Sequence, residues 1–204
     1  MADVAGILLA AGAGRRMGRP KALMRSADAA PWLTAAVRAL QDGGCSPVVV
    51  VLGAAAEEAR ALLGGLEVQV LEATDWATGM GASLRTGLAS LTDWAGSTGR
   101  DGPGVEERPI GATAALIHLV DLPDVGPDVV ARVVDHAAPD VLARADYGQG
   151  AAHPVLIGRE HWPGVIASAH GDRGARDYLR GREVLAVDCS GLATGRDVDT
   201  PADL

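Results

Sequence analysis

Short apolar runs alternate along the chain with longer segments in which apolar residues recur at helical spacing. Four of the runs are brief, rich in Val, Leu or Ile, and bounded by Gly, Asp or Pro, which is typical of buried strands. They cover Val4–Leu9, Pro47–Leu52, Val68–Leu71 and Ala114–Val120. Helices are predicted at Trp32–Leu40, Ala55–Leu63, Gly81–Leu91 and Pro127–His136. This rhythm of strand and helix predicts an α/β fold with a mainly parallel sheet and helices on both faces.

The C-terminal third is less regular. Strands are predicted at Val141–Arg144, Pro154–Ile157 and Val184–Val187, and short helices at Arg159–Ala169 and Gly174–Arg180. The segment Thr92–Pro109 is polar and rich in Gly, Ser and Asp, which is typical of a surface loop and not of a domain boundary. We therefore expect one domain over residues 1–204, which is long enough to bury a substantial core.

Composition narrows the class of protein. The chain has no Phe, so Val, Leu, Ile and Ala must fill its core, and this favours helices packed on a sheet. A net charge of −8 argues against general nucleic-acid binding, which needs a basic face. Cys45 and Cys189 lack metal-ligand spacing, which suggests two reduced thiols, and no apolar run is long enough to span a membrane. We expect a cytoplasmic protein with neither nucleic acid nor membrane as partner.

One basic segment stands out near the N-terminus. Lys21 is the only lysine in the chain, and it ends a loop that contains Gly12, Gly14, Gly18 and several arginines. Glycines expose backbone N–H groups, so the loop suits a small anion, above all a triphosphate, with Lys21 and Arg16 as cations. Neither the Rossmann nor the Walker glycine pattern is present. We expect the Lys21 side chain to face solvent in the absence of ligand.

Two aspartates are candidate metal ligands. Asp121 follows the most apolar predicted strand, where its carboxylate could reach the same crevice as the glycine loop and hold Mg²⁺; it could equally bond its own backbone in a turn. Asp199 could be a second ligand if the C-terminus folds back over the sheet. Thr200 and Asp203 are better explained as caps of a helix that begins at Pro201.

Other polar residues give weaker signals. Ser83 lies in the opening turn of a predicted helix, where a hydroxyl and free N–H groups suit a phosphate or a base. Arg173 and Arg176 are three residues apart and could present one helix face to an anion. His153, which precedes Pro154, is the most interesting histidine, whereas His118 lies within an apolar strand and suggests a hydrogen-bonded core residue.

Five ordered motifs resemble those of the MobA-like nucleotidyltransferase family, which includes the molybdenum cofactor cytidylyltransferases and guanylyltransferases. The resemblance covers nearly the whole chain and implies a three-layer α/β/α, Rossmann-like nucleotidyltransferase fold. The motifs are Leu9–Gly12 with Pro20-Lys21, Gly79-Met80 with Ser83–Arg85, Asp121-Leu122-Pro123, His153-Pro154-Val155 and Asp199–Leu204.

The resemblance implies a Mg²⁺-dependent enzyme that moves a nucleoside monophosphate onto an acceptor phosphate and releases pyrophosphate. It implies that Arg16 and Lys21 bind phosphates, and that Asp121 holds the metal with Asp199 as a second ligand. The implied nucleoside contacts are Ala10, Ala11, Gly12, Gly14 and Ser83. The implied acceptor contacts are His153, Asp172, Arg173 and Arg176. Such a reaction needs no general base, because the attacking phosphate is already ionised.

The resemblance leaves the substrates open. Ala10-Ala11-Gly12 is similar to the cytidylyl branch, which favours CTP, with molybdopterin as the acceptor and a molybdoenzyme as the recipient of the product. Val120 and Ala152 stand where many relatives have Gly, so the acceptor is less certain than the nucleotide. Some relatives are NAD(P)H-dependent oxidoreductases of the nicotine blue type, and a non-catalytic protein that delivers cofactor is a third reading. All readings of a transferase require the glycine loop and both aspartates to converge.

Overall fold

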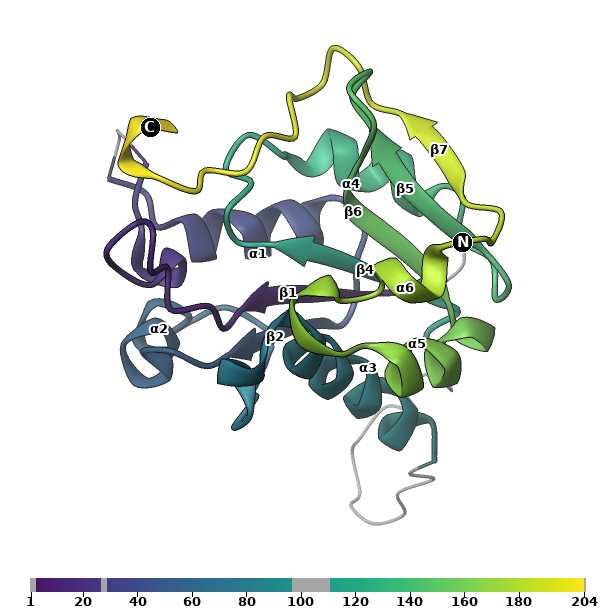
Figure 1. Ribbon diagram of the computed structural model, residues 1–204, viewed down its shortest axis with the longest axis horizontal. Helices are drawn as coiled ribbons and strands as arrows, with labels where there is room; N and C mark the ends of the chain where they lie inside the picture. Colours follow the sequence, from purple (N-terminus) through teal and green to yellow (C-terminus); the bar gives the residue numbers. More distant parts are fainter. Residues whose placement is uncertain (1–2, 27–28, 97–110, 204) are drawn as a thin grey trace.

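A seven-stranded sheet runs through the molecule in the computed structural model, which describes residues 3–26, 29–96 and 111–203 (Figure 1). The strand order is β3-β2-β1-β4-β6-β5-β7. All neighbours are parallel except β6, which runs antiparallel to both β4 and β5. The strands are β1 (Val4–Ala10), β2 (Val48–Leu52), β3 (Gln69–Glu72), β4 (Ala114–Leu119), β5 (Leu142–Asp146), β6 (Ala151–Gly158) and β7 (Leu185–Asp188). The predicted, mainly parallel sheet is confirmed.

Helices cover both faces of this sheet, giving three layers (Figure 1). One face packs against α1 (Trp32–Asp42), α2 (Ala56–Leu62) and α4 (Pro127–Val134). The other face packs against α3 (Met80–Gly96), α5 (Trp162–Ser168) and the short α6 (Arg176–Leu179). Single 3₁₀ turns lie at η1 (Lys21–Leu23), η2 (Trp76–Thr78), η3 (Arg159–His161), η4 (Gly171–Arg173) and η5 (Pro201–Asp203).

Strand β1 shows why the sequence folds this way. All seven of its residues are buried, and they alternate between the two cores: Leu8 packs with α1, and Ile7 packs on the side of α3. Helices cover both sides of a parallel sheet, so its inner strands are buried on both faces. Such a strand needs an unbroken run of apolar residues, because every side chain points into a core. The apolar run that identified β1 in the sequence therefore reflects its central place in the sheet.

Some predicted boundaries differ from the structure. The surface loop expected at Thr92–Pro109 is wrong for its first residues, because α3 continues to Gly96; residues 97–109 of the expected loop lie outside the described residues. The helix expected from Gly174 begins only at Arg176. Gly174 has φ 52°, a left-handed conformation that cannot start a right-handed helix.

The C-terminal segment returns across the sheet after β7, as the yellow trace in Figure 1 shows. The backbone N–H of Val198 donates a hydrogen bond of 3.0 Å to the carbonyl of Asp121, just after β4. This contact brings Asp199 next to Asp121, although the two residues lie far apart in the sequence. Among the described residues, no helix has the length and apolar character needed to cross a bilayer.

Candidate active site

The glycine loop leaves β1 at the carboxyl edge of the sheet and folds back on itself. Gly14 has φ 60°, and a Cβ atom there would overlap the backbone carbonyl of Arg19. Only glycine fits this close approach, so the loop can turn sharply into η1. The turn places the Lys21 side chain over the ends of β1 and β4, toward the segment that carries Asp121.

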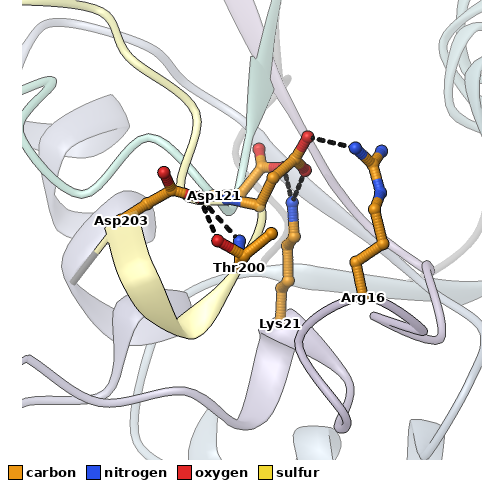
Figure 2. Close-up of polar contacts among 6 residues, drawn as sticks. Arg16, Lys21, Asp121, Thr200 and Asp203 are labelled. Carbon is orange, nitrogen blue, oxygen red and sulfur yellow. Dashed lines mark hydrogen bonds and ion pairs between the residues drawn. The ribbon is translucent and has the colours of Figure 1, made fainter.

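Lys21 bridges the two aspartates (Figure 2). Its Nζ donates hydrogen bonds to Oδ2 of Asp121 at 2.7 Å and to Oδ1 of Asp199 at 2.6 Å. Arg16 reaches the other side of the same carboxylate, with Nη1 2.8 Å from Oδ2 of Asp199. The glycine loop, the end of β4 and the C-terminal segment thus meet at one cluster of two cations and two carboxylates.

The expectation that Lys21 faces solvent is wrong. Its side chain is only 15% exposed, because two carboxylates hold it against the ends of the strands. Burial by itself lowers the pKa of Lys21, but the hydrogen bonds and charges of Asp121 and Asp199 outweigh it, so the net pKa is raised. The hydrogen bond from Lys21 lowers the pKa of Asp199, with further help from Arg16. Lys21 and Asp199 therefore stay ionised at neutral pH.

Asp121 keeps one oxygen unused. Its Oδ1 is buried and has no hydrogen-bond partner among the described residues, whereas Oδ2 binds Lys21. Leaving a buried acceptor unsatisfied costs about 1–3 kcal/mol. An oxygen of this kind in a polar cluster indicates a position where a ligand or an ion binds.

The C-terminal turn η5 fixes the position of Asp199. Oδ2 of Asp203 accepts hydrogen bonds from the backbone N–H groups of Asp199 and Thr200, at 3.2 and 2.7 Å, and from the Thr200 hydroxyl at 2.8 Å. Capping was expected from both residues, but the Thr200 hydroxyl is a donor and Asp203 is the acceptor. The carboxylate lies three residues after Thr200 and bonds back to its N–H, as in one half of a capping box.

The cluster lies at the edge of a cavity of about 450 Å³. Every residue that the sequence indicated for nucleotide or metal contacts lines it, including the buried Ser83 at the start of α3. Met80, which belongs to the Gly79-Met80 motif but had no expected contact, also lines it, as does Trp76, for which the sequence gave no signal. The predicted residues in its wall are Ala10, Ala11, Gly12, Gly14, Arg16, Lys21, Ser83, Asp121 and Asp199.

A larger cavity of about 900 Å³ adjoins the first. Leu9, Met80, Leu119 and Asp172 line both, so the two cavities meet at a common wall. The residues that the resemblance implied for the acceptor, His153, Asp172, Arg173 and Arg176, all line the larger cavity. The nucleotide and acceptor regions expected from the sequence are therefore neighbouring spaces in the fold.

The boundary between the cavities depends on a close backbone contact. Gly79 has φ 119°, and a Cβ atom there would overlap the backbone of Gly171 in η4. The start of α3 can touch η4 only because this residue is glycine. The idea that Arg173 and Arg176 share one helix face is wrong: Arg173 ends η4, Arg176 begins α6, and the left-handed Gly174 lies between them.

Of the two histidines of the central strands, His118 in β4 is fully buried and His153 in β6 is partly buried. Neither ring nitrogen of His118 has a hydrogen-bond partner among the described residues, so the expected core hydrogen bond is absent. Burial, with a smaller effect of the nearby His153, lowers the pKa of His118 to about 3. His153 contacts the Ile117 carbonyl through Nδ1 at 3.4 Å, and burial lowers its pKa as well. Both rings are neutral at physiological pH.

The donor set of the cluster fits Mg²⁺. Mg²⁺ is commonly held by one or two carboxylates together with phosphate oxygens of the substrate. Asp121 and Asp199 supply two carboxylates that converge on one point, and the unused Oδ1 of Asp121 adds a free acceptor. In the part of the chain that the structure describes, no group of three or more His, Cys, Asp or Glu could hold a metal. The remaining ligands would therefore have to come from the phosphates and from water.

Sequence reasoning missed several residues of the larger cavity, of which Arg144 is the clearest. It lies in β5, and the sequence pattern predicts for it only the end of a strand. An arginine inside a strand next to buried alanines is an unusual feature that could have marked it. The other missed polar residues of this wall are Tyr147, Gln149, Arg180, Arg182, Thr194, Arg196 and Asp197.

Comparison with known proteins agrees with this architecture. A model of the MobA-like NTP transferase domain matches residues 6–187. The chain is 34% identical to nicotine blue oxidoreductase of Paenarthrobacter nicotinovorans, over 97% of this chain and 92% of that protein. The crystal structure of Rv0371c from Mycobacterium tuberculosis, 28% identical, covers 99% of this chain and 95% of its own with a TM-score of 0.76.

Two more structures extend the likeness. A manganese complex of Rv0371c matches 98% of this chain and 95% of its own, with 28% identity and a TM-score of 0.72. A nucleotidyl transferase from Methanothermobacter, only 20% identical, matches 98% of this chain and 94% of its own with a TM-score of 0.78, which shows the common fold. With the family match spanning most of its length, this chain belongs to the MobA-like NTP transferase domain family.

Proposed function

We propose that this protein is a nucleotidyltransferase that binds a nucleoside triphosphate with Mg²⁺ and moves the nucleoside monophosphate onto a phosphorylated acceptor. The observation that carries the proposal is the cluster of Lys21, Arg16, Asp121 and Asp199 beside the glycine loop. Two cations and two carboxylates at one point suit a metal–triphosphate complex, since the cations bind phosphate oxygens and the carboxylates bind the metal.

The reaction needs alignment and charge neutralisation more than proton transfer. An acceptor phosphate oxygen attacks the α-phosphorus, the bond from that phosphorus to the bridging oxygen breaks, and pyrophosphate leaves with the electron pair. Lys21 and Arg16 hold the triphosphate oxygens and offset their charge. Bound by Asp121 and Asp199, Mg²⁺ would supply further neutralisation of the same phosphates. Burial lowers the pKa of His118 to about 3 and also lowers that of the partly buried His153, so both rings are weaker bases than a free imidazole, which agrees with a reaction that uses no general base.

The neighbouring cavities support a two-substrate reaction. The glycine loop and Ser83 line the smaller cavity, which would take the nucleotide. The larger cavity adjoins it across Leu9, Met80 and Leu119 and would take the acceptor, with His153, Asp172, Arg173 and Arg176 in its wall. We favour CTP from the Ala10-Ala11-Gly12 motif, and molybdopterin as an acceptor that would pass to a molybdoenzyme.

The test is a pyrophosphate assay. The protein is incubated with each of the four nucleoside triphosphates, Mg²⁺ and molybdopterin, and pyrophosphate release is measured against reactions that lack acceptor. Release that depends on CTP and acceptor supports the proposal in full. Pyrophosphate release with a nucleoside triphosphate other than CTP would change only the proposed base and leave the transferase reaction in place. Nucleotide binding without release would point to a delivery protein, and absence of nucleotide binding overturns the transferase.

A second function has one observation in its favour, the 34% identity to nicotine blue oxidoreductase. The glycine loop could then hold the pyrophosphate of a nicotinamide dinucleotide. Against it, Met17 stands where the Rossmann pattern has its third glycine, and the carboxylate of Asp121 would have no evident task. NAD(P)H oxidation in a dye-reduction assay, together with no binding of nucleoside triphosphate, would favour this function over the first.

A further inference from the structure

Arg144 is a cation in the wall of the larger cavity that has no acidic partner among the described residues. It lies in the middle of β5, between the fully buried Ala143 and Ala145. Its Nε is buried and has no hydrogen-bond partner among the described residues, and no aspartate or glutamate of that part lies within ion-pair distance. Since a guanidinium remains charged at any physiological pH, burying part of it without a partner is costly.

The other arginines of this cavity differ from Arg144. Arg173 and Arg180 form ion pairs with Asp177, and Arg182 donates to the backbone carbonyl of Tyr178. Arg176 and Arg196 are exposed, so water can satisfy them. Arg144 is therefore the arginine of this wall whose charge is both partly buried and unmatched within the described residues.

The row of sheet residues beside Arg144 is apolar. In the sheet register Arg144 pairs with Val155 of β6, and Val155 pairs in turn with Ile117 of β4. Residues directly opposite on neighbouring strands point to the same face, so these three side chains form one row, and all three line the cavity. The register between β5 and β6 shifts just after Arg144, because Arg144 lies opposite Val155 whereas Asp146 lies opposite Ala151, which leaves the extra residues in β6. The cavity therefore has an apolar floor that ends in one guanidinium.

Arg144 also lies far from the Lys21 cluster. Two strand spacings of about 4.8 Å separate it from β4, and Asp121 lies four residues beyond Ile117, just past the end of β4, giving a backbone separation of about 16 Å if the chain stays extended. A phosphate held at the Lys21 cluster is therefore remote from Arg144. A molecule that fills the cavity and reacts near Asp121 would place a different group at Arg144.

We propose that Arg144 forms an anion subsite at the end of the larger cavity, for a ligand whose apolar or aromatic body carries an oxyanion. That this ligand is the acceptor of the transferase reaction rests on the proposed function. The existence of the anion subsite does not depend on it. The acceptor then has two acidic ends: the phosphate that reacts near Asp121, and a second oxyanion that binds Arg144.

The test uses two fluorescent probes that share one aromatic body. 8-Anilinonaphthalene-1-sulfonate carries a sulfonate, and N-phenyl-1-naphthylamine is the same molecule without it. Affinities are measured by fluorescence titration, without nucleotide, for the wild type, Arg144→Gln, Arg144→Lys and Arg159→Gln. Arg159 is an exposed arginine of η3 that lines neither cavity, so it controls for loss of one positive charge. Thermal unfolding confirms that each variant is folded.

We expect Arg144→Gln to weaken binding of the sulfonate probe by about tenfold or more, the loss of one charge-assisted hydrogen bond. Arg144→Lys should lose less, Arg159→Gln should match the wild type, and the neutral probe should bind all four proteins alike. Equal sulfonate affinity in the wild type and Arg144→Gln overturns the subsite. Benzoate and phenyl phosphate are then tested as competitors of the sulfonate probe. The one that displaces the probe at the lower concentration identifies the oxyanion as carboxylate or phosphate. Failure of both to displace the probe also counts against the proposal.

Nucleotide binding separates this inference from the proposed function. Arg144→Gln should bind CTP–Mg²⁺ as the wild type does, whereas Lys21→Ala should lose nucleotide affinity and keep the sulfonate probe. If the wild type binds no nucleoside triphosphate but Arg144→Gln still loses the sulfonate probe, the transferase fails and the subsite stands.

Discussion

The ammonium of Lys21 lies 2.7 Å from the Asp121 carboxylate, although 100 positions separate the two residues in the sequence. The same ammonium lies 2.6 Å from Asp199, so the only lysine of the chain occupies the point where two candidate metal ligands converge. The ammonium in that position competes with a free metal ion for the two carboxylates. When a metal–triphosphate complex binds instead, the triphosphate would attract Lys21 and so free the carboxylates for the metal.

Replacing Lys21 by Ala is therefore expected to have opposite effects on the two ligands. Affinity for the nucleoside triphosphate should fall, because a phosphate-binding cation is lost. Affinity for free Mn²⁺ should rise, because two carboxylates are left without their internal cation. Both are measurable by isothermal titration calorimetry, and Mn²⁺ also by electron paramagnetic resonance.

Lys21→Arg provides the matched control, since it keeps the charge and should not gain Mn²⁺ affinity. The melting temperature gives an independent readout: the Lys21→Ala protein should be destabilised without metal and regain more stability from Mn²⁺ than the wild type does. Unchanged or weaker Mn²⁺ binding by Lys21→Ala would show that Lys21 does not compete with the metal.

Asp121→Asn is expected to reduce kcat by about 100-fold and to change KM for the nucleotide much less, because a metal ligand acts mainly on the charge that develops in the transition state. The substitution keeps the size of the side chain, and Lys21 still has Asp199 as a partner. Steady-state kinetics over a range of Mg²⁺ concentrations provide the measurement. Asp188→Asn is the control, since Asp188 lies in the edge strand β7 and lines neither cavity. Equal turnover and equal metal dependence in Asp121→Asn and the wild type would remove Asp121 from the mechanism.

The central sheet could be predicted from sequence, because its strands are buried on both faces. The unbroken apolar run predicts a strand at Val4–Leu9, and β1 covers Val4–Ala10. The antiparallel direction of β6 was not predicted, since an apolar run such as Pro154–Ile157 has no direction. The short turn before it, with left-handed Gly148 and Gly150, is the local feature that makes a hairpin of β5 and β6.

The contacts of the candidate site were predictable only in part. The glycine loop and Lys21 stand close together in sequence, so local chemistry pointed to an anion site. The contact of Lys21 with Asp199 spans 178 positions and depends on the C-terminal segment crossing the sheet to Asp121. No local pattern encodes that crossing, and it was expected only on the condition that the C-terminus folds back. The sequence does not predict a binding role for Arg144, because the cavity that it lines forms only when β5, β6 and α6 come together in the fold.

Gly79→Ala is expected to destabilise the protein by about 1–3 kcal/mol, because the new Cβ atom would overlap the backbone of Gly171 and an alanine is strained at φ 119°. Urea unfolding measures the change in the free energy of unfolding. Gly65→Ala is the matched control, since Gly65 also has a positive φ, 83°, but no atom lies within 4 Å of a Cβ atom there. The excess loss in Gly79→Ala reports the contact between α3 and η4; equal losses in both variants would show that this contact has no strict size limit.

Arg144→Leu is expected to raise the free energy of unfolding by about 1 kcal/mol or more, because it removes a buried donor that has no partner within the described residues. The same side chain is proposed to bind an oxyanion, so one substitution should increase stability and weaken the sulfonate probe. Urea unfolding of Arg144→Leu and Arg159→Leu measures the first effect, with the exposed Arg159 as reference. A structural arginine would give the reverse result: a clear loss of stability in Arg144→Leu that is absent in Arg159→Leu.

His118 is expected to make the protein sensitive to acid. Burial, with a smaller effect of His153, lowers its pKa from 6.5 to about 3, whereas the unfolded chain binds a proton near pH 6.5. Between these values the unfolded state carries more protons, so the free energy of unfolding must fall as the pH falls, by about 1.4 kcal/mol per pH unit from this group. His153 contributes with the same sign, since burial lowers its pKa too. His118→Leu removes only the first contribution, so urea unfolding between pH 4.5 and 6 should show a shallower pH dependence than in the wild type. Parallel plots of unfolding free energy against pH for the two proteins would mean that the pKa of His118 does not differ between the folded and unfolded states.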